Sequence, residues 1–365
     1  MATTKDYRLG EFTFPRGWFM IAQSHELTHK PLALRYFGRD FALYRGLATG
    51  RVVLLDAYCP HMQTHLGAHN TTSYVVIDNR GTNIVGDDIV CPYHAWKFGP
   101  DGKCNEIPYH DGPIPEAARV KSWPVHESLG AIWIWHDPEG NAPLWPAPDY
   151  PEHSDATWVQ PNAYDDFGTL AVHQAEVIDN ICDYAHFSPI HGAVVSGFDN
   201  SFKGHIAVQR QSGTPKRMID PKTGQGPTFS TVAEYHGPGF LSTRISGIYN
   251  AIILICHTPV DDGSLRVWHT TWMKPPEPMP AFIPQARIVA EMFQETSRLS
   301  FAQDFEIWRH KAPNILGMYL PSDGPFLKAR QWYKQFYNPL AKQSEYLEGT
   351  EGQRWVPKGA KAVVM

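Results

Sequence analysis

The sequence predicts an α+β protein of two domains: an all-β domain at residues 1–150 and, at 151–365, a domain in which helices pack on an antiparallel sheet. Three observations support this fold class. Short segments rich in aromatic and β-branched residues fill the first part, a proline-rich stretch follows them, and the second part combines strand pairs with a long helical pattern. A chain of 365 residues is long for one core and comfortable for two.

The first part is predicted to form short strands that Gly or Asp residues separate. These segments are GWFMIAQ (17–23), ALRYFG (33–38), DFALYRG (40–46), RVVLLDAYC (51–59) and GAIWIWHD (130–137). The stretch PEGNAPLWPAPDYPEH then covers 138–153 and is typical of a linker between domains.

The second part is predicted to be mixed. A helix is expected over about 170–187. Strands are expected at 240–260 and 264–275, on either side of the turn residues DDG. A long helical pattern then covers 284–311.

Composition argues against several classes of partner. The net charge is −5 and the pI is near 6.4, so neither nucleic acid nor an anionic membrane surface is expected to bind. The N-terminus has no secretory pattern, and the longest apolar stretch, YNAIILICHTPV, is too short for a membrane span. Five cysteines without a secreted-scaffold pattern favour a cytoplasmic protein in which some cysteines bind metal.

Two mixed pairs of Cys and His form the first candidate metal site. Cys59 and His61 have the spacing C-x-H, and Cys91 and His94 have the spacing C-x-x-H. Unrelated buried cysteines are one alternative and structural zinc is another, although zinc usually takes C-x-x-C and H-x-x-x-H pairs. Mixed pairs that each follow a strand fit a Rieske centre better, because its [2Fe–2S] cluster has two cysteines on one iron and two histidines on the other.

The segment NICDYAHFSPIH contains the second candidate site. Residues five apart on a helix point about 140° away from each other, so His186 and His191 could not share a metal along a straight helix. Pro189 lies between them and does not continue a regular helix, so we expect the chain to turn there and bring His191 back. A helix-capping histidine and a histidine hydrogen-bonded in the core remain the alternative.

A third ligand is expected from the long helical pattern. Phe301, Phe305 and Trp308 form an i, i+4, i+7 stripe, and Asp304 falls within it. A carboxylate on a buried face is costly unless it is paired or binds metal. An exposed aspartate, or one paired with Arg309 or Lys311, is the alternative. Together with two histidines, Asp304 fits the 2-His-1-carboxylate triad of non-haem Fe(II).

These motifs together resemble the catalytic α-subunits of the Rieske non-haem iron oxygenases over nearly the whole chain. The pairs C-x-H and C-x-x-H, followed by D-x-x-H-x-x-x-x-H, are the basis of the resemblance. The closer resemblance is to the oxygenase component of bacterial 3-ketosteroid 9α-hydroxylases. It rests on LLDAYCPHM, CPYHAWKFGPDGKC, IDNICDYAHFSPIHG, FKGHIA, FAQDFEIWRHK and RQWYKQFY.

The resemblance implies an N-terminal all-β Rieske [2Fe–2S] domain and a C-terminal helix-grip (START/Bet v1-like) domain holding mononuclear Fe(II). Respiratory Rieske proteins carry a disulfide between their two ligand loops, whereas the resemblance places Thr64 and Tyr93 at the matching positions here. One departure from most relatives is the 29 residues between His61 and Cys91. The extra piece, about 68–88, contains SYVVID and is expected to form an added hairpin.

The resemblance also implies an assembly and an electron path. It implies a head-to-tail homotrimer, in which each Rieske domain lies beside a neighbour's iron. Asp183 is expected on the same helical side as His186, where it would bridge a Rieske histidine of the adjacent subunit and an iron-ligand histidine. Asp179, one turn earlier, is expected to support the site, with a solvated helix aspartate as the alternative.

The activity implied is that of a monooxygenase that uses O2 and electrons from NADH, through a flavin and iron–sulfur reductase or a ferredoxin. The substrate expected is a polycyclic apolar molecule, a 3-ketosteroid hydroxylated at the 9α position. An O-demethylase, a sterol desaturase and an aromatic-acid hydroxylase remain alternatives. An electron-transfer Rieske protein fused to a lipid-binding module is disfavoured, since it has no need of His186, His191 and Asp304 together.

Overall fold

The computed structural model describes residues 2–73, 75–76, 81–161, 163–315 and 317–363. The chain forms two compact units. The first, here the Rieske unit, comprises Phe19–His136 and Gly140–Ala147. The second, here the catalytic unit, comprises Met1–Trp18, Asp137–Glu139 and Pro148–Met365, so the N-terminal segment packs with the C-terminal part of the chain.

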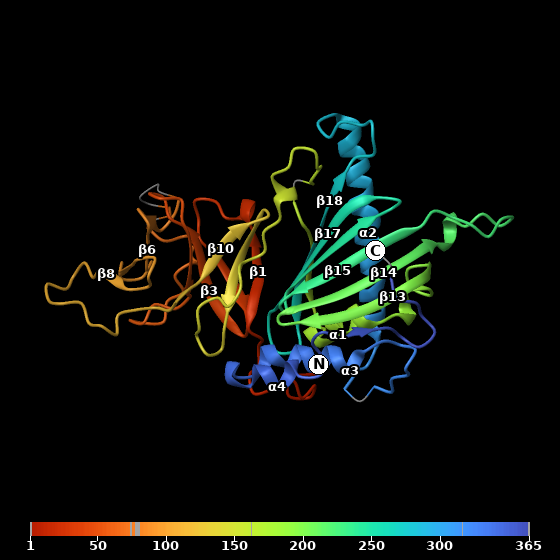
Figure 1. Cartoon of the computed structure of the whole chain (residues 1–365). Coiled ribbons are helices and arrows are strands. Elements are labelled where there is room, and N and C mark those ends of the chain that lie inside the picture. The colour runs from red at the N-terminus through yellow and green to blue at the C-terminus, as the bar shows by residue number, and fades with distance from the viewer. Residues whose placement is uncertain (1, 74, 77–80, 162, 316, 364–365) are drawn as a thin grey trace. The chain divides into compact units, whose positions relative to one another are not determined.

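The Rieske unit is built from short strands in three sheets (Figure 1). The sheet orders are β1-β11-β10, β2-β3-β4-β9 and β5-β6-β7-β8. Its strands are β1 (Gly17–Gln23), β2 (Leu32–Tyr36), β3 (Arg39–Arg45), β4 (Val52–Asp56), β5 (Ile84–Val85), β6 (Asp88–Val90), β7 (Lys97–Phe98), β8 (Cys104–Glu106), β9 (Ser122–Trp123), β10 (Val125–Ser128) and β11 (Ala131–His136), with one 3₁₀ turn, η1 (Ser24–Glu26). All five strands predicted from the sequence are present.

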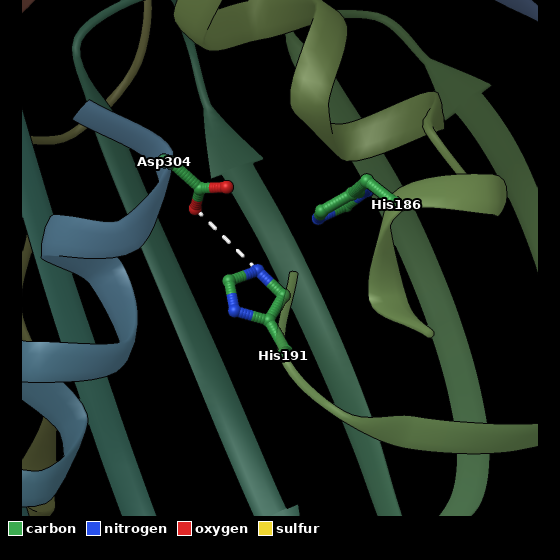
Figure 2. A group of neighbouring side chains, drawn as sticks. All are labelled: His186, His191 and Asp304. Atoms are coloured by element: carbon green, nitrogen blue, oxygen red, sulfur yellow. Dashed lines mark ion pairs between the residues drawn. The ribbon is translucent and has the colours of Figure 1, made fainter. Parts of the chain in front are cut away.

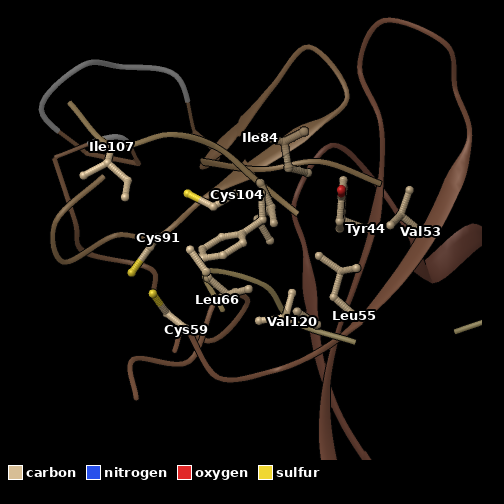
Figure 3. Close-up of a cluster of buried hydrophobic side chains, with 14 residues drawn as sticks. Tyr44, Val53, Leu55, Cys59, Leu66, Ile84, Cys91, Cys104, Ile107 and Val120 are labelled. Atoms are coloured by element: carbon tan, nitrogen blue, oxygen red, sulfur yellow. The ribbon is translucent and has the colours of Figure 1, made fainter. Parts of the chain in front are cut away.

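Apolar side chains from β3 to β8 form the core beneath the two loops that begin at Cys59 and Cys91 (Figure 3). Tyr44, Val53 and Leu55 pack with side chains of the last sheet, and the sulfur atoms of Cys59 and Cys91 face each other at the edge of this core. Each of the two loops is therefore anchored by its cysteine in a packed apolar layer.

The hairpin expected within 68–88 is found only in part. Ser73, Val75 and Val76 of the segment SYVVID lie in turns, while residues 74, 77 and 78 lie outside the described residues. The described hairpin is the later pair β5 and β6, in which Ile84 pairs with Ile89.

An eight-stranded antiparallel sheet forms the centre of the catalytic unit (Figure 1). The strand order is β12-β18-β17-β16-β15-β14-β13-β19. The strands are β12 (Asp165–Leu170), β13 (Ala193–Lys203), β14 (Ile206–Pro215), β15 (Phe229–His236), β16 (Phe240–Ser246), β17 (Asn250–Pro259), β18 (Leu265–Lys274) and β19 (Arg354–Trp355).

Helices and short 3₁₀ turns accompany this sheet. They are α1 (Gln174–Asp179), α2 (Pro284–His310), α3 (Phe326–Lys334) and α4 (Gln343–Leu347), with η2 (Pro151–His153), η3 (Asn180–Cys182), η4 (Ala185–Phe187), η5 (Lys216–Met218), η6 (Gln335–Tyr337) and η7 (Leu340–Lys342). The long α2 packs on β18 through Phe305, Trp308 and Val267, which confirms the helix predicted at 284–311. The predicted α+β fold class is confirmed.

The helix expected over 170–187 is wrong as a single element. Leu170 ends β12, the α-helical part is α1 alone, and two 3₁₀ turns follow it. Asp183 has extended backbone angles (φ −79°, ψ 99°), so the helix cannot run through it. No helix in the described part of the chain combines the length and apolarity needed to cross a membrane.

Candidate metal centres

His186, His191 and Asp304 come together in the catalytic unit (Figure 2). One ligand atom from each of the three lies within 4.8 Å of the other two. Nε2 of His191 is 3.5 Å from Oδ2 of Asp304, and the two imidazole rings lie 5.0 Å apart between centroids. The segment NICDYAHFSPIH contains the two histidines, but the carboxylate of the group, Asp304, comes from α2.

The chain turns between the two histidines, as the proline predicted. His186 lies in η4, and the N–H of Ile190 donates to its carbonyl oxygen at 2.9 Å. Gly192 follows with φ +61°, a left-handed conformation that glycine adopts without strain, and leads into β13. This turn brings His191 back to face His186.

In each of the two imidazoles, Nδ1 is within hydrogen-bond distance of a group other than His186, His191 and Asp304. Nδ1 of His186 is 2.8 Å from the carbonyl oxygen of Asp183, and Nδ1 of His191 is 3.2 Å from both Gln303 Oε1 and Ser300 Oγ. Such contacts fix the tautomer and leave each Nε2 as a metal-binding nitrogen. The three residues therefore fit a divalent metal as two neutral nitrogens and one carboxylate.

Asp304 is buried in the face of α2 that carries the aromatic stripe. Burial lowers the pKa of His191, but the Asp304 carboxylate outweighs it and the net pKa is raised. Lys311, the alternative partner for this aspartate, instead pairs with Glu176. A buried carboxylate facing two histidines is the arrangement that a cation stabilises.

The three residues lie in the wall of a cavity of about 750 Å³. Alternate residues of β15, β16 and β17 give it apolar surface: Phe229, Ala233, Leu241, Ile245, Ile253 and Ile255. Gln209 and Gln211 on β14 also line it, and no sequence pattern singled them out. The cavity is of the size and character that accepts a mostly apolar ligand.

The loops that begin at Cys59 and Cys91 have the same backbone hydrogen bonds. In each loop the cysteine N–H donates to the carbonyl oxygen of the residue five positions on: Cys59 to Thr64 at 2.9 Å, and Cys91 to Trp96 at 2.7 Å. The residue four positions on, Gln63 or Ala95, has positive φ and returns its N–H to the cysteine carbonyl. Two matching loops thus present their cysteines and histidines to a common space.

The two cysteines and the two histidines of these loops differ in burial. Cys59 and Cys91 are buried, whereas the rings of His61 and His94 lie 4.6 Å apart on the outer side. The Cys59 thiol, together with backbone N–H groups, lowers the pKa of Cys91. The Trp96 ring stacks on the His61 ring, with 4.7 Å between centroids.

Comparison with known proteins identifies the family. The Rieske [2Fe–2S] domain matches residues 17–124, and the 3-ketosteroid 9alpha-hydroxylase C-terminal domain matches residues 134–337. The chain belongs to the Rieske non-haem iron monooxygenases. As a member, the enzyme carries a Rieske [2Fe–2S] cluster and a mononuclear non-haem iron.

Several curated relatives of this Rieske monooxygenase align over most of their length. The chain is 31% identical to a 3-ketosteroid-9-alpha-monooxygenase oxygenase component of Rhodococcus rhodochrous, over 96% of this chain and 90% of the relative. It is 31% identical to the protein of that name from Mycolicibacterium smegmatis, over 90% and 84%. It is 29% identical to cholesterol 7-desaturase of Xenopus laevis, over 94% and 75%.

Solved structures share the fold at lower identity. Pseudomonas putida NdmA with caffeine matches with a TM-score of 0.68 and 17% identity, over 97% of both chains. Dicamba monooxygenase bound to dicamba matches with a TM-score of 0.61 and 18% identity, over 90% of this chain and 98% of that one.

The two acidic residues predicted to support the iron site of this monooxygenase lie in different surroundings. Oδ1 of Asp183 accepts hydrogen bonds from the N–H groups of Ala185 and His186 at 3.1 and 3.2 Å. Burial raises the pKa of Asp183, but His186 outweighs it and the net pKa is lowered. Asp183 contacts His186 through the turn between η3 and η4. The expectation that both residues lie on one side of a helix is wrong.

Asp179 is buried and accepts two hydrogen bonds from Arg330, at 2.9 Å from Nε and 2.6 Å from Nη2. Burial raises the pKa of Asp179 more than this guanidinium lowers it. The alternative of a solvated aspartate is therefore wrong. Asn180 and Ile181, which follow Asp179, line the cavity. The Asp179–Arg330 ion pair therefore holds the backbone that leads to the two histidines.

Replacing Asp179 with Ala is expected to destabilise the catalytic unit. Breaking a buried ion pair leaves the Arg330 guanidinium uncompensated, which typically costs about 3–5 kcal/mol. Urea denaturation followed by tryptophan fluorescence measures the loss. Glu295→Ala, which removes an exposed partner of Arg298, is the control and should cost less than about 1 kcal/mol. Equal urea midpoints for the two variants would show that the Asp179–Arg330 pair does not stabilise the fold.

Proposed function

We propose that this enzyme is the oxygenase component that hydroxylates a 3-ketosteroid at the 9α position. The observation that supports it most is the set His186, His191 and Asp304 in the wall of a large apolar cavity. A flat polycyclic ketone needs an apolar pocket with a few polar groups, and this cavity combines apolar strand residues with polar ones such as Gln209 and Gln211. The relatives aligned over nearly the whole chain are named for this reaction.

We propose that His186, His191 and Asp304 hold the mononuclear iron, and that Cys59, His61, Cys91 and His94 hold the [2Fe–2S] cluster. When bound, the iron supplies O2 activation and the [2Fe–2S] cluster supplies single electrons.

The chain itself positions the ligand side chains and the substrate. Ser300 and Gln303 hold the His191 ring, the Asp183 carbonyl holds the His186 ring, and apolar residues of the strands line the cavity that would take the substrate.

Asp183 is proposed as the link between subunits of a homotrimer. Its side chain is 34% exposed although it holds the turn that carries His186, so part of the carboxylate is open to a neighbouring chain. An NADH-dependent reductase, directly or through a ferredoxin, is proposed as the electron source. The proposal includes a cytoplasmic location, where NADH is available.

A substrate panel tests the reaction. The enzyme, with a surrogate reductase and NADH, is offered 3-ketosteroids, 3-hydroxysterols and aromatic acids, and the products are identified by mass spectrometry and NMR. The expected result is a 3-ketosteroid that has gained one hydroxyl group at the 9α position. Turnover of aromatic acids alone would contradict the proposal.

A sterol desaturase is the second candidate, because the cholesterol 7-desaturase aligns over 94% of this chain. The same panel separates the two candidates, since a desaturated product has lost two hydrogen atoms and a hydroxylated product has gained one oxygen atom.

A further inference from the structure

Three side chains form a hydrogen-bonded line from the side of the sheet into the cavity. Asp165 on β12 pairs directly opposite His269 on β18, and its Oδ2 lies 3.0 Å from Nδ1 of that ring. Nε2 of His269 lies 2.8 Å from Oγ of Ser297 on α2. Three elements that are far apart in the sequence therefore meet in one continuous contact, which no local motif could reveal.

Exposure changes along this line. The Asp165 side chain is 25% exposed, whereas the His269 side chain is fully buried. His269 and Ser297 both line the cavity that contains the three proposed iron ligands. The rings of Phe167 and Phe301 flank the imidazole, at 6.5 and 6.3 Å between centroids. The line thus joins a residue that meets solvent to a hydroxyl in the cavity, through an imidazole packed beside aromatic rings.

Monooxygenation consumes protons in this cavity. A C–H bond, O2, two electrons and two protons give a C–OH group and one water, and the reductase supplies the electrons. Much of the strand lining is apolar, with Phe229, Ala233, Leu241, Ile245, Ile253 and Ile255, and these side chains cannot carry protons. An imidazole is the side chain best suited to take up and release a proton near neutral pH.

We propose that Asp165, His269 and Ser297 form a path that delivers a proton, held on His269, to the cavity during turnover. The Asp165 carboxylate holds Nδ1–H of His269, and this leaves Nε2 to exchange a proton with the Ser297 hydroxyl. In the delivering step the Nε2–H bond of the imidazolium breaks, a new O–H bond forms on Ser297, and the earlier hydroxyl hydrogen passes to reduced oxygen in the cavity. The ring is left neutral with Nδ1–H still held by the Asp165 carboxylate, and Nε2 takes up a new proton through Ser297 between turnovers.

The charged groups near this path include Arg298, and Lys216 and Arg217 also line the cavity. Arg298 follows Ser297 on α2, interacts electrostatically with Asp165, and is itself paired with Glu295. Ser297, Phe301 and Asp304 share one face of α2, and Ser297 lies about 10 Å along the axis from Asp304 because each residue rises about 1.5 Å. The remaining distance lies inside the cavity, whose 750 Å³ leaves room for waters of about 30 Å³ each beside a ligand.

Single-turnover kinetics test this path. The reduced enzyme with substrate is mixed with O2 in H2O and in D2O, which removes the reductase from the measured rate. Ser297→Ala and Asp165→Asn should each slow product formation by about 100-fold, the lower end of what a positioned proton transfer contributes, and should increase the solvent isotope effect. Substrate affinity, measured by tryptophan fluorescence, should stay that of the parent.

A matched control comes from the next residue of β12. Asp166 is 30% exposed and pairs with Arg266 on the surface, so Asp166→Asn removes the same charge and should leave both the rate and the isotope effect unchanged. A readout independent of turnover is the ¹⁵N NMR of His269, with the cluster oxidised and zinc in the iron site. Nδ1 should carry a proton in the parent, and Asp165→Asn should shift part of the population to the Nε2–H tautomer.

The path would be overturned if both variants matched the parent in rate and isotope effect, or if their losses came from weaker substrate binding alone. An unchanged His269 tautomer in Asp165→Asn would also overturn it. None of these results bears on which substrate is hydroxylated, because the path would serve any substrate of the monooxygenase.

Discussion

Replacing Asp304 with Ala is expected to abolish hydroxylation while leaving the Rieske cluster intact. The substitution removes the one carboxylate from the group His186, His191 and Asp304. Loss of a residue that only supports a ligand costs about 10–100-fold, so loss of the ligand should cost more than about 100-fold in turnover. Product formation, iron content and the EPR signal of the reduced cluster measure the outcome together.

The expected pattern is loss of the mononuclear iron, loss of product and an unchanged EPR signal of the [2Fe–2S] cluster. Glu306→Ala is the matched control, since Glu306 lies two residues further on α2 and its side chain is 68% exposed. It should behave as the parent does. Hydroxylation retained in Asp304→Ala would remove this residue from the ligand set.

Replacing Asp183 with Asn is expected to slow electron transfer without loss of either metal. The amide oxygen can still accept the N–H groups of Ala185 and His186, so the turn should persist. The negative charge and the second acceptor oxygen are lost, and with them the proposed contact to a histidine of the neighbouring chain. Re-oxidation of the pre-reduced cluster, followed by stopped-flow absorbance with substrate and O2, should fall by about 100-fold.

Asp323→Asn is the control for this experiment. Asp323 lies next to the same segment, its carbonyl oxygen accepts the N–H of Tyr184, and its carboxylate accepts the N–H of Leu320. Asp323→Asn removes the same charge as Asp183→Asn and should leave the re-oxidation rate of the cluster unchanged. If Asp183→Asn re-oxidised as fast as the parent, the bridging role would be abandoned.

The sequence predicted the elements whose physical signal is local. The stripe Phe301, Phe305 and Trp308 predicted α2, and the same stripe made a buried Asp304 conspicuous. Pro189 predicted the turn that brings His191 back to His186. In these places the periodicity and the backbone chemistry of a few neighbouring residues determine the outcome.

Other features depend on contacts that the sequence does not show. Strands β13 to β15 were not predicted, since buried polar residues such as Asp199 and Gln211 interrupt their alternation. Asp199 is buried because it holds Arg210 and Arg354, which a local pattern cannot reveal. Likewise, the first residues pack with the distant end of the chain, where Asn338 Nδ2 donates to the carbonyl oxygen of Leu9 at 3.0 Å.

One measurement tests most directly whether the site formed by His186, His191 and Asp304 oxygenates a polycyclic ketone in the cavity. The reduced enzyme and a 3-ketosteroid are mixed with ¹⁸O2 for a single turnover, and the product is analysed by mass spectrometry. The expected product carries one ¹⁸O atom in a new 9α-hydroxyl group for the parent and for Glu306→Ala, and none forms with Asp304→Ala. A product whose new oxygen comes from water, or labelled product from Asp304→Ala, would contradict the assignment.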